Sequence, residues 1–408
     1  MKIDISKSLN KNIDRSKWKK YYFSDFAENI VEKIVPKKSG LEHYIGLEHL
    51  DAGSLKIRRF GETKSLIGDK LKIYKGDLIF AKRNAYLKRV AVAEFDAVAS
   101  AHSMVLRPKS EIVLPEFLPF FMLSDKFWNK AIEISVGSLS PTINWKALAK
   151  QEFLLPPKQD QTKLAKLLWA ADNVVEKDKE LLEKLEALKF RTLKFIFTDG
   201  YGSQKLKPFG KFKIPENWDI KTIENVANIE YGISESVANN TNSSIGWPIL
   251  TGANITLKGE LDISKLVYIQ EPKNEKFYLN IGDLLFNWRS GSPEHIGKTA
   301  MFSLEGNYTY ASFILRIRCF KDFNTFYAYY LLNHLREIEY FTKDVAQQVN
   351  FKMNASIFRQ VKIPIPDTET QINIVNKIKK INDQIVLSQS KLQASQALLK
   401  SLINEVFV

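Results

Sequence analysis

The chain has 408 residues, an apolar share of 45%, and 60 lysines and arginines against 46 acids, which gives a net charge of +14. This length predicts two or three domains, and the basic surplus favours a polyanionic partner, nucleic acid first and an anionic membrane second, although it is also compatible with solubility alone. The single cysteine, Cys319, excludes an internal disulfide, and no apolar run reaches the roughly 18 residues of a membrane span. We therefore expect a cytoplasmic protein without a membrane partner.

Residues 1–156 carry the alternating apolar pattern of a mixed α and β domain. A turn at 75–77 precedes a fully apolar run, and a basic loop follows that run. The aromatic-rich segment 117–132 predicts one helix after Pro115. Strands are predicted at Leu71–Tyr74, Leu78–Phe80, Val90–Ala93 and Ser103–Arg107.

Two long helices with an apolar heptad are predicted, one in the middle of the chain and one at its end. Apolar residues recur mostly at alternating steps of four and three, which is typical of a coiled-coil seam. Each seam has a polar break at the same level, Asp178 in the middle helix and Ser388 in the last helix. The middle seam is Leu164, Leu168, Ala171, Val175, Asp178, Leu182 and Leu185; the last seam is Ile374, Ile378, Ile381, Ile385, Ser388, Leu392, Ser395, Leu399, Leu402 and Val406.

The second half of the chain repeats the first half. The spacing between matching residues drifts only from 200 (Trp18 and Trp218) to 210 (Gln161 and Gln371), and the order of the matches is kept. Chance matches would not keep this register, so the chain is a duplication. Between these limits, Gly76–Phe80 matches Gly282–Phe286, Leu106–Arg107 matches Leu315–Arg316, Asn144 matches Asn354, and Pro156 matches Pro366.

The predicted fold class is α+β: two mixed α/β domains in tandem repeat, separated by two long helices that pair as an antiparallel coiled coil with pseudo-two-fold symmetry. The expected boundaries are 1–156 for the first domain, 157–199 for the central helix, 200–365 for the second domain and 366–408 for the last helix. Proteins with two-fold symmetry bind DNA half-sites whose spacing mirrors their own. Two different domains on such a scaffold would bind two different half-sites.

The first candidate DNA-binding region runs from Lys56 to Arg89 and has eleven lysines and arginines against three acids. Such a segment suits phosphates, and arginine and asparagine also pair with guanine and adenine edges. The alternative is a solvated charged face. Its position in a duplicated, basic protein favours DNA. The candidate residues are Lys56, Arg58, Arg59, Lys82, Arg83, Asn84, Lys88 and Arg89.

The matching loop of the second half, 287–299, contains Gly297-Lys298-Thr299. A phosphate-binding P-loop needs four residues between its glycines and a following helix. Here five residues separate Gly291 from Gly297, and the residues that follow have the pattern of a strand, so we reject a nucleotide site. A DNA-facing loop is favoured over a plain hairpin, with Arg289, Ser290, His295 and Lys298 as candidates.

A second pair of loops, 137–146 and 346–354, is rich in amides and hydroxyls and lacks acids. Such side chains suit base edges and phosphates, but turn and helix-cap chemistry explains them equally well, above all for Asn144 and Asn354. The candidate DNA-binding residues are Ser140, Thr142, Gln347, Gln348, Asn350 and Lys352.

Catalytic signatures are lacking. The five histidines show no metal-ligand spacing, no glycine-rich cofactor loop is found, and the Asn/Asp-Pro-Pro-aromatic tetrapeptide of amino-methyltransferases is missing. No catalytic residue, metal site or cofactor is therefore assigned.

The middle helix has a second apolar stripe, which would accept a helix of another subunit or would pack on the chain's own domains. This stripe comprises Leu167, Val174, Leu181, Leu188 and Phe195.

The chain resembles the specificity subunits of type I restriction-modification systems along essentially its whole length. The resemblance rests on the two Gly-Asp-Leu-(Ile/Leu)-Phe segments and on the proline-then-glutamine starts of both long helices. The first half departs from the family's Pro-Glu-x-Trp opening, since it has Asp14–Trp18 there. The other marks are Tyr44–Leu50 and Ile214–Trp218.

This resemblance implies two target-recognition domains that each bind one half of a split, asymmetric site in double-stranded DNA, with the helices setting the gap. It also implies two methyltransferase subunits docked on the helices and restriction subunits joining that core. S-adenosylmethionine, ATP and magnesium are then expected on the partner subunits, and none on this chain. The rival hypotheses are a free-standing DNA-binding regulator with two heads and a nuclease or methyltransferase with an unrecognised site.

Overall fold

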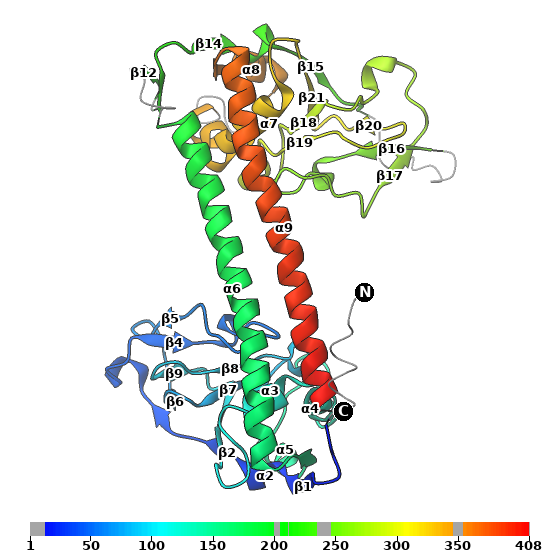
Figure 1. The fold of residues 1–408 in the computed structure, drawn as a ribbon. Coiled ribbons are helices and arrows are strands. Elements are labelled where there is room, and N and C mark those ends of the chain that lie inside the picture. Colours follow the sequence, from blue (N-terminus) through cyan, green and yellow to red (C-terminus); the bar gives the residue numbers. More distant parts are fainter. Residues whose placement is uncertain (1–12, 200–204, 211, 235–245, 346–353, 408) are drawn as a thin grey trace. The chain divides into compact units, whose positions relative to one another are not determined.

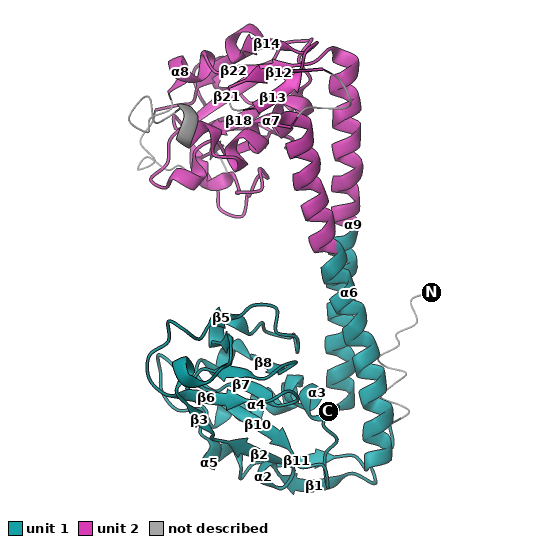
Figure 2. Cartoon of the chain, turned by 90° about the vertical axis from the view of Figure 1, so that its left-hand side faces the viewer, with its two compact units in different colours: residues 1–181, 388–408 teal, residues 182–387 magenta. Residues whose placement is uncertain are grey.

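The computed structural model describes residues 13–199, 205–210, 212–234, 246–345 and 354–407. The chain forms two compact units, residues 1–181 with 388–408 (unit 1) and residues 182–387 (unit 2), drawn in teal and magenta in Figure 2. Each long helix contributes one half to each unit. Among the described helices, none is both long and apolar enough to cross a bilayer.

Unit 1 contains two small sheets, whose strands follow one another along the chain (Figure 1). An antiparallel sheet has the order β2-β10-β7-β8, and a mixed sheet has the order β3-β6-β9-β4-β5 with β4 parallel to β9. A further pair, β1 with β11, joins the two ends of the domain. The strands are β1 Lys19–Tyr22, β2 Ala27–Ile30, β3 Lys33–Ile34, β4 His43–Ile45, β5 Gly61–Glu62, β6 Lys70–Ile73, β7 Leu78–Ala81, β8 Val90–Val92, β9 Ala97–Ala99, β10 Ser103–Pro108 and β11 Glu152–Leu155.

The short helices of unit 1 are α2 (Phe23–Phe26), α3 (Leu118–Leu123), α4 (Asp125–Glu133) and α5 (Trp145–Leu148). The single helix predicted over 117–132 is therefore wrong in one respect, because it is broken at Ser124. This residue is extended (φ −69°, ψ 148°), and its hydroxyl accepts a hydrogen bond from the Phe127 N–H, so it caps α4.

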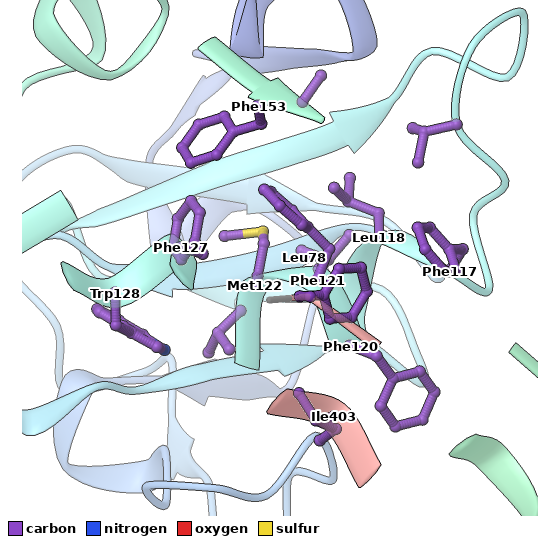
Figure 3. Packing of buried hydrophobic residues seen from close by; sticks show 14 of the residues in the cluster. Leu78, Phe117, Leu118, Phe120, Phe121, Met122, Phe127, Trp128, Phe153 and Ile403 are labelled. Carbon is purple, nitrogen blue, oxygen red and sulfur yellow. The ribbon is translucent and has the colours of Figure 1, made fainter. Parts of the chain in front are cut away.

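The core of unit 1 is aromatic and lies where these helices meet the first sheet. Phe121, Phe127 and Phe153 pack edge to face or tilted at centroid distances of 5.0–6.1 Å. Ile403 enters the same cluster from the last helix, although it is about 250 residues away in sequence (Figure 3). The carboxyl end of the chain is thus part of the core of the first domain.

The two long helices are α6 (Lys158–Phe197) and α9 (Thr368–Val406), and in each unit they lie side by side and antiparallel (Figures 1 and 2). In unit 1 the start of α6 shares a core with the end of α9, through Leu164 and Leu402, whereas in unit 2 the end of α6 shares one with the start of α9, through Ile196 and Ile374. All seam residues are buried or half-buried, including Asp178 and Ser388. The predicted coiled coil is confirmed, and each buried apolar side chain of the seam contributes roughly 1.5–3 kcal/mol before entropy is subtracted.

Unit 2 repeats this architecture. The sheet β15-β21-β18-β19 corresponds to β2-β10-β7-β8, the parallel pair β16 and β20 corresponds to β4 and β9, and β14 with β22 corresponds to β1 with β11. One helix, α7, replaces α3 and α4, and the pair β12 with β13 is an addition. The elements are β12 Leu206–Phe209, β13 Phe212–Pro215, β14 Asp219–Thr222, β15 Ala227–Tyr231, β16 Trp247–Leu250, β17 Val267–Ile269, β18 Leu284–Asn287, β19 Thr299–Met301, β20 Thr309–Tyr310, β21 Ile314–Cys319, α7 Thr325–Glu337, α8 Ala355–Arg359 and β22 Lys362–Ile365.

Two buried polar contacts recur in both units. Gln161 and Gln371 each accept a hydrogen bond from a backbone N–H of the preceding domain, and each donates to one carbonyl of that domain and to the carbonyl of a proline before the helix, at 2.8–3.2 Å. Each glutamine therefore fixes the direction in which its long helix leaves the domain. This explains the proline-then-glutamine pattern at both helix starts.

The second recurring contact corrects one sequence match. Asp77 accepts two hydrogen bonds from Arg107 at 2.8 and 3.0 Å, and Asp283 accepts two from Arg318 at 2.7 Å. The strand register also pairs Leu106 with Leu78, and Ile317 with Leu284. The equivalent of Arg107 is thus Arg318, so the match of Leu106–Arg107 with Leu315–Arg316 was displaced by two residues.

Candidate nucleic-acid interface

The basic loop of unit 1 leaves the end of β7 and returns at β8. Asn84 (φ 56°) and Lys88 (φ 47°) are two of the three non-glycine residues with positive φ in the described part of the chain. A short 3-10 turn, Ala85–Leu87, lies between them and is closed by the Leu87 N–H donating to Asn84 O at 3.0 Å. Such conformations are strained for residues with a Cβ, and they cluster at functional sites.

The cations of this loop have different surroundings. Arg83 is exposed, and no acid within the described ranges lies at ion-pair distance from it; Lys82 is half-buried. Lys88 donates to Asp125 Oδ1 at 3.0 Å, and this hydrogen bond is the main cause of the lowered pKa of Asp125. Arg89 donates to the carbonyl of Leu47 at 2.5 Å. Arg83 is therefore the cation of the loop that is most available to a partner.

The other basic candidates of unit 1 lie towards α6. Arg58 donates to Glu176 Oε2 at 2.6 Å, and Lys179 donates to the second oxygen at 2.9 Å. Burial alone would raise the pKa of Glu176, but these two hydrogen bonds outweigh it and the pKa is lowered. Lys56 is half-buried near Asp172, whereas Arg59 is exposed and pairs with Asp51. The sequence could not show that this group contacts the helix.

The serine-rich loop 137–141 lies against the basic loop. Thr142 forms an antiparallel bridge with Arg83, the Ala85 N–H donates to Pro141 O at 3.2 Å, and the Ile143 N–H donates to Lys82 O at 2.8 Å. The Thr142 hydroxyl donates to Ser140 O at 3.0 Å. The structure therefore brings together two segments that the sequence analysis selected separately, around Arg83 and around Ser140 and Thr142.

The corresponding loop of unit 2 follows β18 and borders a cavity of about 950 Å³. All four candidates of this loop line the cavity: Arg289, Ser290, His295 and Lys298. Arg289 is exposed, and its guanidinium carbon lies over the ring of Phe313, 5.2 Å from the centroid, which is a cation–π contact. The strand predicted after Thr299 is confirmed as β19, so the rejection of a P-loop rests on the structure as well.

Lys298 is buried (5% exposed), and its ammonium donates to the carbonyls of Gly252 and Ile255 at 2.7 and 2.5 Å. Burial lowers its pKa. Lys298 lies directly before β19, as Arg89 lies directly before β8. In unit 2, Lys298 holds the loop onto the turn after β16, and in unit 1 Arg89 holds the loop onto the turn after β4. The two cations have the same place in the two units, and both donate to backbone carbonyls of these turns, Arg89 to one and Lys298 to two.

The remaining candidates are the polar residues around the second pair of loops. Gln347, Gln348, Asn350 and Lys352 lie outside the described residues. Asn354 caps α8 through the Ile357 N–H at 2.9 Å, whereas Asn144 occupies the cap position of α5 without a side-chain hydrogen bond. Neither charge nor period in the sequence distinguishes Phe313 and Thr251 of the cavity wall, or the exposed Leu139 and Tyr86 of the two loops of unit 1.

Two repeats, each with a basic loop at the same edge of the same sheet, define a DNA-recognition protein built by duplication. A family model described as the type I restriction modification DNA specificity domain matches residues 15–187 and again residues 215–395, which together are most of the chain. The chain therefore belongs to the type I restriction modification DNA specificity family. Its role is that of the recognition subunit of such a system and not of an enzyme.

Relatives and solved structures agree with this assignment. The MjaX type I restriction enzyme specificity subunit of Methanocaldococcus jannaschii is 23% identical over 372 residues, 88% of this chain and 84% of that protein. The HindI specificity subunit of Haemophilus influenzae is 25% identical over 195 residues, 45% of this chain and 41% of that protein. These relatives carry the name of a specificity subunit, as expected from the resemblance.

Two solved structures have the same fold. A chain from a type I restriction-modification system, solved to explain complex assembly and conformational transition, covers 95% of this chain and 98% of its own length at a TM-score of 0.59 and 20% identity. The type I specificity subunit of M. genitalium covers 98% of both chains at a TM-score of 0.56 and 12% identity. At these identities the likeness concerns the fold alone.

Proposed function

We propose that residues 1–156 and 200–365 are two target-recognition domains that each bind one half of a bipartite, asymmetric site in double-stranded DNA. The observation that carries this proposal is the equivalence of the two basic loops. Arg83 follows Phe80 of β7 by three residues, and Arg289 follows Phe286 of β18 by three residues, and both guanidinium groups are exposed. The two loops differ in every neighbouring side chain, which suits two different half-sites.

Arginine pairs bidentately with guanine, and a loop fixed by backbone hydrogen bonds can present it to a groove at little entropic cost. Phosphates and further base edges are then bound by the other exposed or half-buried candidates. These are Lys56, Arg59, Lys82, Asn84, Ser140, Thr142, Ser290 and His295, with Gln347, Gln348, Asn350 and Lys352 proposed from the sequence.

Four other basic residues hold the loops in place, because their cationic groups are already bonded within the chain. Arg58 is bonded to Glu176, Lys88 to Asp125, Arg89 to Leu47, and Lys298 to Gly252. We assign them a positioning role, to which their positive charge adds long-range attraction for DNA.

We further propose that the second stripe of α6 docks the methyltransferase subunits. Leu167, Val174, Leu181, Leu188 and Phe195 are 39–51% exposed, so a large part of each side chain is open to a partner. Apolar residues spaced by seven on one helix match what a partner helix buries. The pairing of α6 with α9 would set the gap between the half-sites, and restriction subunits would join this core.

In this proposal the partners carry the chemistry. Two methyltransferase subunits would bind S-adenosylmethionine, and restriction subunits would use ATP and magnesium, while this chain contributes recognition. The complex would act in the cytoplasm, where its DNA substrate is. No group of three or more histidine, cysteine, aspartate or glutamate side chains within the described ranges has the geometry of a metal site.

The test is a methylome of cells that express this chain with its cognate methyltransferase subunit in an unmethylated host. We expect N6-methyladenine in one split motif with a fixed gap. Arg83→Ala should relax or change one half of the motif, and Arg289→Ala the other half, because a lost bidentate contact costs roughly 1–3 kcal/mol. Lys75→Ala is the matched control, since Lys75 is exposed at the opposite end of β7.

Three results would contradict the proposal. A stable complex without methylation would favour a free-standing regulator. Methylation or cleavage by the isolated chain would favour an enzyme. Loss of the whole motif on Arg83→Ala would show that the two domains do not act on separate halves.

A further inference from the structure

An apolar side chain stands at the tip of the loop that lies against the basic loop of unit 1. Leu139 is 94% exposed, and Val136 at the base of the same loop is 66% exposed. Tyr86 of the basic loop is 58% exposed. Large apolar side chains with this exposure are a cost in a monomer unless a partner covers them.

The loop that carries Leu139 is rigidly held. The Val136 N–H donates to Thr142 O at 3.0 Å and the Thr142 N–H donates back to Val136 O at 2.9 Å, so the five residues 137–141 form a closed hairpin. Gly137 makes the turn at φ +108°, in a region that disfavours any side chain. Leu139 is the third of these five residues, at the tip of a hairpin whose closing residue Thr142 bridges Arg83.

The surroundings of Leu139 identify the partner. No acid occurs between Ile134 and Gln151, nor between Leu78 and Ala93, so both segments that meet at Arg83 and Thr142 lack negative charge. An apolar tip on a hairpin that carries hydroxyls and bridges Arg83, which has no ion-pair partner within the described ranges, fits a polyanion with apolar surfaces inside its grooves, which is duplex DNA. Base surfaces there include thymine methyl groups and the faces of partly unstacked bases.

We propose that Leu139 is a specificity-determining residue that makes apolar contact with bases in the half-site bound by unit 1. This rests on the proposed function and adds a residue that charge and hydrogen-bonding chemistry do not select. Arg83 would contribute affinity and a guanine contact, whereas Leu139 would discriminate bases by shape and by the thymine methyl group.

The test compares Leu139→Ser with Ile67→Ser in the complex of the full chain with its methyltransferase subunit. Ile67 is 85% exposed and also belongs to unit 1, so it controls for the removal of surface apolar area. We measure binding to a duplex with the motif and to a scrambled duplex over a salt series, and we sequence the methylome. Leu139→Met keeps an apolar tip and should retain the wild-type preference.

We expect Leu139→Ser to lower the preference for the motif over the scrambled duplex about tenfold, as a mismatched base pair does. The slope of affinity against salt should not change, because no phosphate contact is lost. The methylome should relax at one position, in the half that Arg83→Ala also alters, and Ile67→Ser should change neither readout.

Two results would overturn the inference while leaving the proposed function intact. One is an unchanged preference and motif in Leu139→Ser. The other is reduced co-purification of the methyltransferase subunit with unchanged DNA preference, which would make the tip a protein contact. If the wild-type complex itself shows no preference for any split motif, the proposed function fails instead.

Discussion

The two units share the strand order of their four-stranded sheet but differ in the polar contacts that attach each domain to the long helices. In unit 1 the apolar contacts are joined by two polar ones: Arg58 pairs with Glu176 of α6, and Asp125 exchanges two hydrogen bonds of 2.8 Å with Asn404 of α9. In unit 2 the apolar contacts are joined by an exposed ion pair of 3.7 Å between Lys258 and Glu186 of α6. The last residues of α6 pack on α7, where Phe197 lies 5.7 Å from the ring of His334.

This difference shows which contacts the duplication kept. The glutamines at both helix starts and the buried aspartates of both hairpins are retained, because they satisfy backbone groups that every copy of the fold has. The side-chain contacts between domain and helix are not retained. At the positions equivalent to Asp172 and Glu176, α9 has Asn382, which donates to the Tyr330 hydroxyl at 3.0 Å, and Val386, which is 62% exposed.

The largest expected effect tests the ion pair of Arg58 with Glu176. Glu176→Ala leaves Arg58 and Lys179 without their acid at side chains that are only 20% and 18% exposed. We expect a loss of about 3 kcal/mol in the free energy of unfolding of unit 1, because removing the acid of a largely buried ion pair is costly. Val386→Ala is the matched control in unit 2 and should stay within about 0.5 kcal/mol. Urea unfolding followed by pulsed hydrogen exchange resolves the two units; equal losses in both variants would refute the asymmetry.

The next effect concerns unit 2 at acid pH. His334 is fully buried, neither ring nitrogen has a hydrogen-bond partner in the part of the chain that the structure describes, and burial lowers its pKa to about 4. The unfolded chain binds the proton near pH 6.5, so the stability that neutral His334 confers is present above that pH and is lost as pH falls towards 4. We expect unit 2 to lose about 2 kcal/mol between pH 8 and pH 5.

His334→Leu should remove this pH dependence, because leucine fills a similar volume and does not titrate. The measurement is the urea midpoint of unit 2 at both pH values. A wild-type midpoint that stays constant would contradict the burial of a neutral histidine.

The smallest expected effect has the opposite sign and belongs to unit 1. Burial, and next the charge of Glu176, raise the pKa of Asp172 to about 6, while Lys179 and Lys56 act against this. The folded carboxyl holds its proton more tightly than the unfolded one, so acidification from pH 8 to pH 5 should stabilise unit 1 by about 1 kcal/mol. Asp172→Asn, which installs the residue that α9 has at this position, should remove the gain. If unit 1 and unit 2 shift in the same direction with pH, this comparison fails.

The sequence predicted the parts of the fold that depend on period. The heptads of α6 and α9 and the strands around Leu78 and Leu284 follow from apolar spacing alone, which tertiary packing then uses directly. The break at Ser124 was not predicted, because a single capping residue inside an aromatic-rich segment leaves the spacing of the apolar residues unchanged. The displaced match of Arg107 arose because strand pairing, and not residue identity, fixes the register.

The candidate site was predictable as a region but not residue by residue. Charge selected the basic loop of the first half and the repeat selected its counterpart, but whether a cation faces solvent or a carbonyl depends on neighbours that are distant in sequence. Arg83 and Lys298 look alike in the sequence, and only the fold shows that one is open and the other is bonded to Gly252 and Ile255. Leu139 carries no charge signal at all, so only its exposure reveals it.

The shared helices also determine when each unit can be completed during synthesis. Val406 and Phe407, at the carboxyl end of the chain, are buried in the core of unit 1 beside Phe117 and Phe121. Domains usually fold in the order in which the ribosome releases them. Here the domain that is made first lacks part of its core until α9 has been synthesised, so a ribosome that stalls anywhere before α9 leaves both halves of the protein unfinished.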